Sequence, residues 1–414
     1  MAWRRVDTNA TPGLSPMTST RTSPREPLLG NPAHLRGLSR LGIDGLVGVT
    51  HLVESMHHSI ASRAGIVGPG PAGRPSGVTG FVYGAVRGTT RIFGRGIDVV
   101  LAALLRDTGS STPKREALVA ALNGVWGDHL ADTGNPLAIA MSLRIGGHPY
   151  EAALKAPTGR LLVLVHGLGM NDLQWARGAH DHGQALARDL GFTPVYLHYN
   201  SGRHVSQNGR EFAARLDRLV ASWPVPVEEL VIVGHSMGGL VARSACHIGA
   251  GQAWMAALSK LVFLGTPHHG AALERGGQLV DSVLDISPYV APFARLSKAR
   301  SAGITDLRFG NLQDADWQDR DRHAQQHDDR VPTPLPEGVQ SYLVAATKAE
   351  KTSSLRSAMI GDGLVPLASA LGEHDDPALA LDVPKSHRLV VTSAGHWDLL
   401  DRADVYAKLR GWLA

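Results

Sequence analysis

Six short apolar runs recur along the chain after residue 160, separated by longer amphipathic stretches. The run 161–165 consists only of Leu and Val, which is typical of a strand buried on both faces of a parallel sheet. Runs of the same kind occur at residues 194–199, 230–233, 261–264, 341–345 and 389–391. Before them, apolar and polar residues alternate over 137–145, which is typical of a strand. Gly146-Gly147 predicts a hairpin turn to a partner strand at 148–154. We therefore expect two antiparallel strands followed by parallel ones.

Amphipathic segments fill the gaps between these runs. Helical spacing of apolar residues predicts helices at 176–190, 206–222, 237–249 and 398–412. Alternation of strands and helices is typical of an α/β fold, in which a mostly parallel sheet carries helices on both faces.

The chain divides by composition into a tail, an extension and a main domain. Residues 1–34 are rich in Thr, Ser, Pro and Arg and predict a mobile tail. Residues 35–136 predict a helical N-terminal extension, with a helix at 113–130 capped by Thr112. The main domain spans 137–414. Within it, residues 271–337 contain repeated prolines and a His/Asp/Gln-rich run, which predicts an inserted cap.

Charge and cysteine content narrow the possible partners. Residues 1–150 hold 15 Lys and Arg against 9 Asp and Glu, so residues 35–130 either pack on the main domain or make a peripheral contact with a membrane or lipid surface. No nucleic-acid-binding motif is present, and we expect no nucleic-acid partner.

Cys246 is the only cysteine, which excludes an intrachain disulfide. We see no secretory signal and no apolar run long enough to cross a membrane, so we expect a cytoplasmic protein of undetermined oligomeric state.

The strongest chemical motif is the segment Gly234-His235-Ser236-Met237-Gly238. It matches the pattern Gly-x-Ser-x-Gly of a nucleophile elbow, in which a serine lies on a sharp turn between a strand and a helix. Small residues are needed two positions on either side, because side chains would collide there. An apolar strand precedes the motif and a helix follows it, so Ser236 is the predicted nucleophile rather than a simple helix cap.

A serine hydroxyl needs a base to remove its proton, and in this arrangement the acid and the base follow the serine in that order. His396 follows the last predicted strand and is the expected base, ahead of His387 and His374. The expected acid is Asp362, which lies between two glycines in the loop after the strand 341–345. The competing acidic residues look like solvated loop charges or follow the histidine; they are Glu350, Glu373, Asp375, Asp376, Asp398 and Asp401.

The oxyanion of a tetrahedral intermediate needs preorganised donors. The backbone N–H of Met237, at the start of the helix after the serine, is one candidate. The other is the N–H of Leu168, in the loop after strand 161–165, with Gly169 as the alternative. We expect the side chain of His166 to brace this loop.

These motifs resemble those of the α/β-hydrolase lipases and esterases, in particular the bacterial triacylglycerol-lipase branch and the GPI inositol-deacylase-like branch. The resemblance rests on His166-Gly167, the elbow, Gly265-Thr266-Pro267-His268-His269-Gly270, Gly361-Asp362-Gly363 and Gly395-His396, and it covers about residues 137–414. It implies ester hydrolysis through an acyl-enzyme, no cofactor, and a cap over the acyl pocket. Members of this family place the loop 265–270 beside the active site, and we assign His268 and His269 no catalytic role. We recognise no calcium site.

We therefore expect a lipase or esterase with a Ser236–His396–Asp362 triad acting on an ester or lipid substrate. Three alternatives remain open. The same triad would serve an acyltransferase or a deacylase of membrane lipids. The chain could also be a binding protein on a hydrolase scaffold, or a peptidase.

Overall fold

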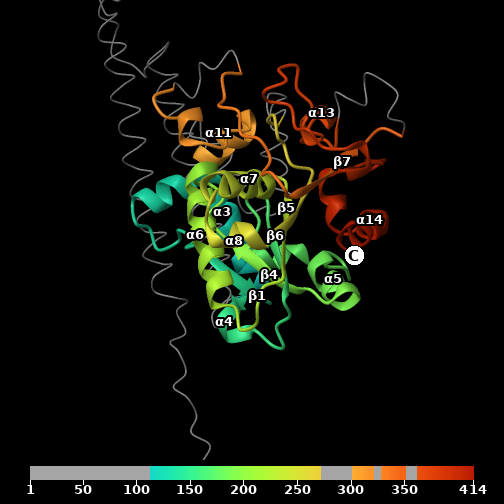
Figure 1. Cartoon of the computed structure of the whole chain (residues 1–414). Coiled ribbons are helices and arrows are strands. Elements are labelled where there is room, and N and C mark those ends of the chain that lie inside the picture. The colour runs from blue at the N-terminus through green and yellow to red at the C-terminus, as the bar shows by residue number, and fades with distance from the viewer. Residues whose placement is uncertain (1–111, 272–300, 321–327, 351–360) are drawn as a thin grey trace, which may run out of the picture.

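The computed structural model describes residues 112–271, 301–320, 328–350 and 361–414, which are coloured in Figure 1. The predicted tail at 1–34, the extension at 35–111 and the cap residues 272–300 and 321–327 lie outside the described residues.

The described residues form one eight-stranded sheet in the order β2-β1-β4-β3-β5-β6-β7-β8. The strands are β1 (Ser142–Ile145), β2 (His148–Pro149), β3 (Arg160–Val165), β4 (Thr193–His198), β5 (Glu229–His235), β6 (Leu258–Leu264), β7 (Gln340–Thr347) and β8 (Arg388–Thr392). β1 is antiparallel to both β2 and β4, and the remaining pairs are parallel. All six apolar runs are therefore confirmed as parallel strands.

Both faces of the sheet are buried, which explains why the parallel strands are continuously apolar. Leu161 and Val163 of β3 belong to one hydrophobic core, whereas Leu162 and Leu164 belong to the other. Burying a Leu or Val side chain contributes roughly 1.5–3 kcal/mol, so an inward-facing residue at every position stabilises the strand from both sides.

Helices cover each face, as predicted (Figure 1). One face carries α6 (Val205–Ser222), α7 (Met237–Ile248) and α8 (Ala253–Ala257). The other carries α5 (His182–Leu190) and α14 (Ala403–Leu413). These elements confirm a mostly parallel α/β sheet with helices on both sides.

The predicted hairpin is shorter than the alternation indicated. Strand pairing starts only at Ser142, because the side chain of Asn123 binds the carbonyl of Leu137 and the N–H of Ile139 in place of a neighbouring strand. After Pro149 the chain turns into the short helix α4 (Tyr150–Ala153). The prediction of strands over all of 137–145 and 148–154 was therefore wrong at both outer ends.

Two helices start later than predicted. α5 begins at His182 rather than 176, since the Asp181 side chain caps it by accepting from Gln184 N over 2.9 Å. The preceding residues Asp172–Trp175 form the 3₁₀ helix η1. α14 begins at Ala403, because His396–Leu400 form the 3₁₀ helix η5.

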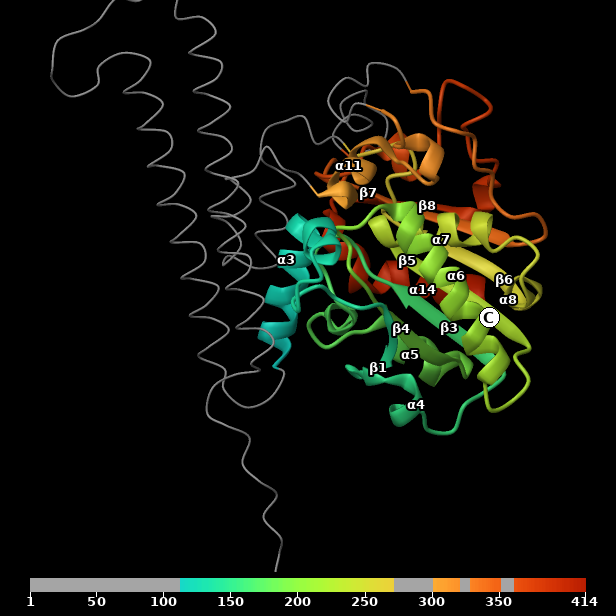
Figure 2. The same cartoon turned by 90° about the vertical axis from the view of Figure 1, so that its left-hand side faces the viewer.

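The helix predicted at 113–130 is α3 (Pro113–Asp132), and Thr112 caps it as expected, with its hydroxyl accepting from Arg115 N over 3.3 Å. α3 lies against the side of the domain (Figure 2). Leu118, Leu122 and Val125 are buried in the core that α6 and α7 share. This helix therefore packs on the main domain, and these side chains face protein.

α11 (Ala302–Phe309), which belongs to the predicted cap, lies beyond the carboxyl ends of the strands, at the same end of the molecule as α13 (Leu367–Ala370) (Figure 1). In the part of the chain that the structure describes, no helix combines the length and the apolarity that crossing a bilayer requires.

Candidate active site

Ser236 lies at the turn from β5 into α7, with φ 53° and ψ −126°. A non-glycine residue in this region of backbone space costs on the order of 1–3 kcal/mol, which the surrounding packing must offset. The flanking glycines make the turn possible. A Cβ on Gly234 would lie 2.6 Å from Gly239 Cα, and one on Gly238 would lie 2.1 Å from the carbonyl oxygen of Val165. The geometry is that of the predicted nucleophile elbow.

Two neighbouring segments hold Ser236 in place. Its N–H donates to the carbonyl of Leu264, at the end of β6, over 2.8 Å. The loop after β3 touches it from the other side, since a Cβ on Gly167 would lie 3.0 Å from Ser236 Cβ. The elbow is thus flanked by the ends of both strands adjacent to β5.

Asp362 and His396 are hydrogen-bonded to each other and buried. His396 Nδ1 donates to Asp362 Oδ2 over 2.6 Å. The second carboxylate oxygen accepts from the N–H groups of Leu364 and Val365, at 2.9 and 2.8 Å. These bonds fix the carboxylate, and the carboxylate in turn fixes the imidazole.

His396 follows β8 and lies at the same end of the sheet as Ser236. A Cβ on Gly265, the residue after Leu264, would lie 3.1 Å from His396 Cε1. The His396 ring also packs on the ring of His235, with 4.8 Å between centroids. Among the described residues no hydrogen bond joins the Ser236 hydroxyl to His396; such bonds are often long before substrate binds.

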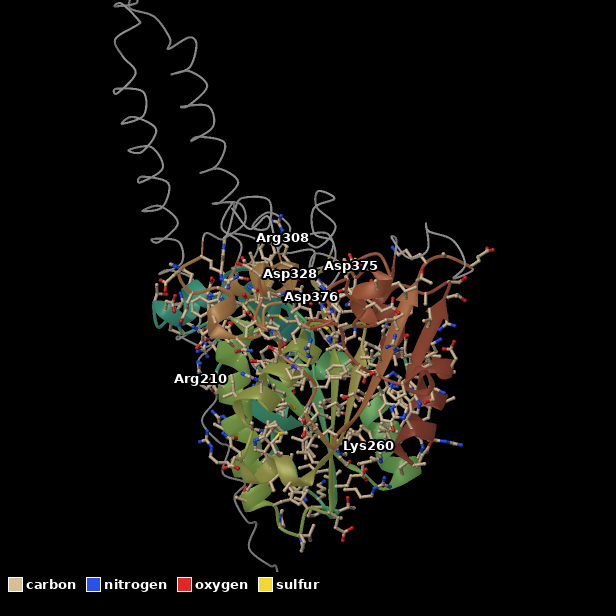
Figure 3. The ribbon with its side chains drawn as sticks, turned by 45° about the horizontal axis from the view of Figure 1, so that its top comes forward. Arg210, Lys260, Arg308, Asp328, Asp375 and Asp376 are labelled. Atoms are coloured by element: carbon tan, nitrogen blue, oxygen red, sulfur yellow. The ribbon has the colours of Figure 1, made fainter. Side chains whose placement is uncertain are left out.

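The competing acidic residues have other partners or face solvent. Asp398 Oδ2 accepts from the N–H of Gly395, Asp401 pairs with Arg177, and Glu373 pairs with Arg388. Asp375 and Asp376 are exposed at the cap end of the molecule (Figure 3), and Glu350 is exposed too.

The competing histidines lie away from Ser236. His387 Nδ1 bonds to the carbonyl of Ser341, near the beginning of β7, which is the opposite end of the sheet. His374 Nε2 lies 3.1 Å from Asp328 Oδ2. The structure therefore pairs only His396 of these three with Asp362.

The candidate oxyanion donors flank the serine. Met237 is the first residue of α7, where an N–H has no partner inside the helix. The N–H of Gly169, the alternative donor in the loop, already donates to Ser201 Oγ over 2.9 Å. Leu168 N–H makes no hydrogen bond with another described residue, so the geometry favours it over Gly169. No sequence pattern pointed to Ser201.

His166 is buried beneath this loop. Its ring stacks on Tyr199 with 4.3 Å between centroids, and its Nδ1 donates to the carbonyl of Gly167 over 2.9 Å. Burial lowers the pKa of His166 to about 3, so the ring is neutral at physiological pH. Its contacts are those of a bracing residue. Burial, together with the charge of His396, also lowers the pKa of His235 well below its usual value.

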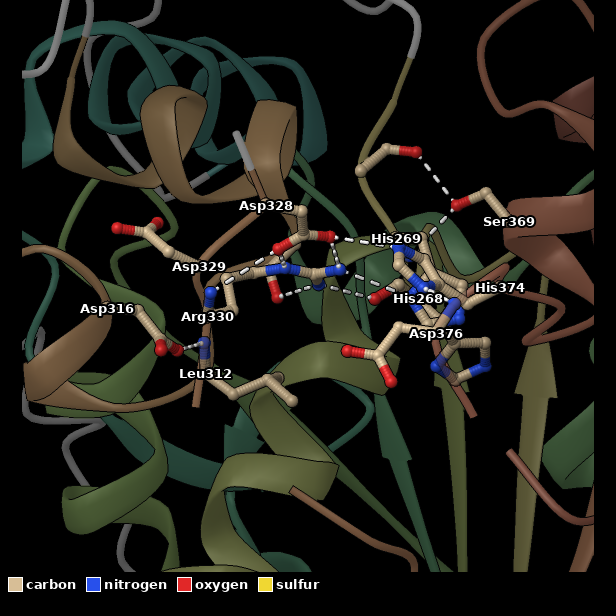
Figure 4. A network of polar contacts seen from close by, with 12 residues as sticks. His268, His269, Leu312, Asp316, Asp328, Asp329, Arg330, Ser369, His374 and Asp376 are labelled. Carbon is tan, nitrogen blue, oxygen red and sulfur yellow. Dashed lines mark hydrogen bonds and ion pairs between the residues drawn. The ribbon is translucent and has the colours of Figure 1, made fainter. Parts of the chain in front are cut away.

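His268 and His269 belong to a buried polar network that ties the described cap residues to the sheet (Figure 4). Arg330 donates to the carbonyls of His268 and Gly310, both over 2.9 Å, and to both oxygens of Asp328. Arg243 of α7 contacts His268 Nδ1 and the carbonyl of Thr333, and burial lowers its pKa to about 9. A cavity lined by Arg243, Arg330 and both histidines lies in this network rather than at Ser236.

The described residues contain no candidate metal site. Over the described ranges, no three or more His, Cys, Asp or Glu side chains are grouped so that they could hold a metal ion.

Comparison with known proteins gives one family match and a set of distantly similar solved structures. Residues 156–323 match the family model of the PGAP1-like alpha/beta domain. A search of curated proteins gives no match. Among solved structures, the mature Bacillus licheniformis lipase BlEst2 is 17% identical, covering 66% of this chain and 97% of its own, with a TM-score of 0.41. EstA from Clostridium botulinum is 13% identical, covering 64% of this chain and 90% of its own, with a TM-score of 0.38.

The sheet order, the elbow and the family match agree with one another. The chain is an α/β-hydrolase-fold protein whose residues 156–323 match the PGAP1-like alpha/beta domain.

Proposed function

We propose that the protein is a serine hydrolase that cleaves carboxylic esters through an acyl-enzyme. The observation that carries this proposal is the 2.6 Å hydrogen bond between His396 and Asp362, formed at the same end of the sheet as the strained elbow of Ser236. A nucleophile, a base and an orienting acid in this chain order match the requirements of acyl transfer.

In the proposed mechanism, Ser236 Oγ attacks the ester carbonyl while His396 Nε2 removes its proton. Asp362 keeps the Nδ1 proton of His396 in place and stabilises the imidazolium that forms. The N–H groups of Met237 and Leu168 bind the oxyanion, and each such donor is worth about 3–4 kcal/mol. His396 then protonates the leaving alcohol, which departs. A water activated by His396 releases the acid and restores the serine.

The proposed substrates are esters of lipids or of other acyl-bearing alcohols. The resemblance of the motifs to those of lipases and esterases supports this class, as does the match to the PGAP1-like alpha/beta domain. Residues 35–111, from the basic N-terminal part of the chain, are proposed to supply any contact with a lipid surface, since α3 packs its apolar side chains on the domain.

The test is hydrolysis of p-nitrophenyl esters from acetyl to palmitoyl by the full chain. We expect measurable turnover, with a preference along the series that identifies the acyl length. Ser236→Ala should lose it by a factor of about 10⁴ or more, because a positioned serine is the nucleophile. Wild-type turnover in Ser236→Ala would refute the assignment.

A further inference from the structure

The loop that carries the candidate oxyanion donor, residues 166–170, is held by a residue from a different segment. Ser201 is fully buried, and its hydroxyl accepts the N–H of Gly169 over 2.9 Å. Gly169 has φ +69°, a left-handed conformation that glycine adopts without strain. This bond occupies the donor next to Leu168 and leaves the Leu168 N–H as the free one.

Ser201 lies in a short turn, residues 200–202, that is itself fixed on several sides. Asn200 Nδ2 donates to the carbonyl of Gly127 over 2.7 Å, and Asn200 Oδ1 accepts the N–H of Gly202 over 3.1 Å. Asn208 of α6 donates to the carbonyl of Asn200 over 2.9 Å. The turn is thus bonded to α3 and to α6, both of which belong to the folded core.

Helix α3 contacts both the turn and the oxyanion loop through glycines. A Cβ on Gly124 would lie 2.8 Å from Gly169 Cα, and one on Gly127 would lie 1.8 Å from Asn200 Oδ1. A Cβ on Gly202 would lie 2.1 Å from the carbonyl oxygen of Asn123. Glycine is unfavourable inside a helix, yet α3 has one at its contact with the oxyanion loop and another at its contact with Asn200.

Residues of the predicted cap contact both α3 and turn 200–202. Ser301 Oγ donates to the carbonyl of Gly124 over 2.7 Å, and Gly303 N–H donates to the carbonyl of Gly202 over 3.0 Å. Turn 200–202 therefore lies between α3, the oxyanion loop and the start of α11.

We propose that Ser201 is a positioning residue for the oxyanion hole, and that α3 is the surface against which its turn is held. This inference rests on the proposed ester hydrolase function. Ser201 fixes Gly169, and the fixed loop presents Leu168 N–H toward the carbonyl oxygen bound at Ser236. A helix that precedes the matched residues 156–323 thus supports the oxyanion loop, directly and through this turn.

The test compares Ser201→Ala with Ser244→Ala in the full chain, using the best p-nitrophenyl ester. Ser244 is a matched control, because it is equally buried and its hydroxyl also bonds a backbone group, the carbonyl of Leu312, over 2.7 Å. We expect Ser201→Ala to lower kcat about tenfold to a hundredfold, with KM changed less than about twofold, since an oxyanion donor acts in the transition state. Ser244→Ala should keep kcat within about twofold.

A second variant and a second measurement distinguish a loss of positioning from misfolding. Ser201→Cys keeps nearly the same volume but accepts hydrogen bonds weakly, so it should lower kcat in the same way. Amide hydrogen exchange in residues 167–170 should speed up in both Ser201 variants and not in Ser244→Ala. A folded Ser201→Ala or Ser201→Cys with wild-type kcat overturns the positioning role. An inactive wild type, or an active Ser236→Ala, overturns the proposed function itself and this inference with it.

Discussion

At the scale of single residues, the candidate chemistry depends on local backbone geometry at Ser236 and Asp362. The glycines around Ser236 and around Asp362 are needed by turns that the structure contains, with φ of 51° at Gly361 and 100° at Gly363. Ser201 could not be predicted, because its role depends on a contact with Gly169, which is 32 positions away along the chain.

Asp362→Asn should lower kcat by about 10⁴ while the fold persists. The amide would keep an oxygen for the N–H groups of Leu364 and Val365, but its NH₂ would donate to His396 Nδ1 and move the ring proton to Nε2. A base that already carries its proton on Nε2 cannot accept one from Ser236. Steady-state hydrolysis is the measurement, and Asp376→Asn, an exposed alternative, should retain wild-type kcat. Equal losses in the two variants would contradict the assignment of Asp362.

At the scale of elements, parallel strands were predictable because each buries both faces and therefore reads as a continuous apolar run. The ends of the hairpin could not be predicted, because the Asn123 side chain of α3 forms hydrogen bonds with the backbone of residues 137–139. No local sequence pattern indicates such a contact between distant segments. The anchoring of the cap by Arg330 and His268 was missed for the same reason: the motif 265–270 was visible, but Arg330 lies 62 positions from His268 along the chain.

Two helical glycines should respond in opposite ways to alanine. Gly127→Ala places a Cβ 1.8 Å from Asn200 Oδ1 and should destabilise the protein by about 1–3 kcal/mol, the usual cost of overpacking. Gly411→Ala in α14 meets nothing within 4 Å and should stabilise it by up to about 1 kcal/mol. Urea unfolding measures both free energies. A neutral Gly127→Ala would contradict the close contact between α3 and turn 200–202.

At the scale of the whole molecule, several histidines are buried in neutral form. Burial lowers the pKa of His166 to about 3 and that of His182 to about 4, and it holds the pKa of His235 well below its usual value. The unfolded chain binds protons at these groups below about pH 6.5, whereas the folded protein does not. Protonation of these histidines therefore stabilises the unfolded chain relative to the folded protein as the pH falls.

The free energy of unfolding should accordingly fall as the pH decreases from about 6.5 toward 4. Each such histidine contributes at most about 1.4 kcal/mol per pH unit. Urea unfolding at pH 7.5, 6 and 5 tests this. A decline that starts near pH 6.5 identifies histidines, because carboxylates would act only at lower pH. A constant free energy from pH 7.5 to 5 would show that these rings do not remain neutral in the folded protein.

The central claim is that Ser236 is an activated nucleophile, and labelling with a fluorophosphonate probe tests it most directly. The probe reacts with a serine only when a base and an oxyanion site assist it. We predict stoichiometric labelling of the full chain, with the phosphonate located on Ser236 by peptide mass spectrometry, and no labelling of Ser236→Ala. Labelling of a different residue, or none in a folded wild-type protein, would contradict the account.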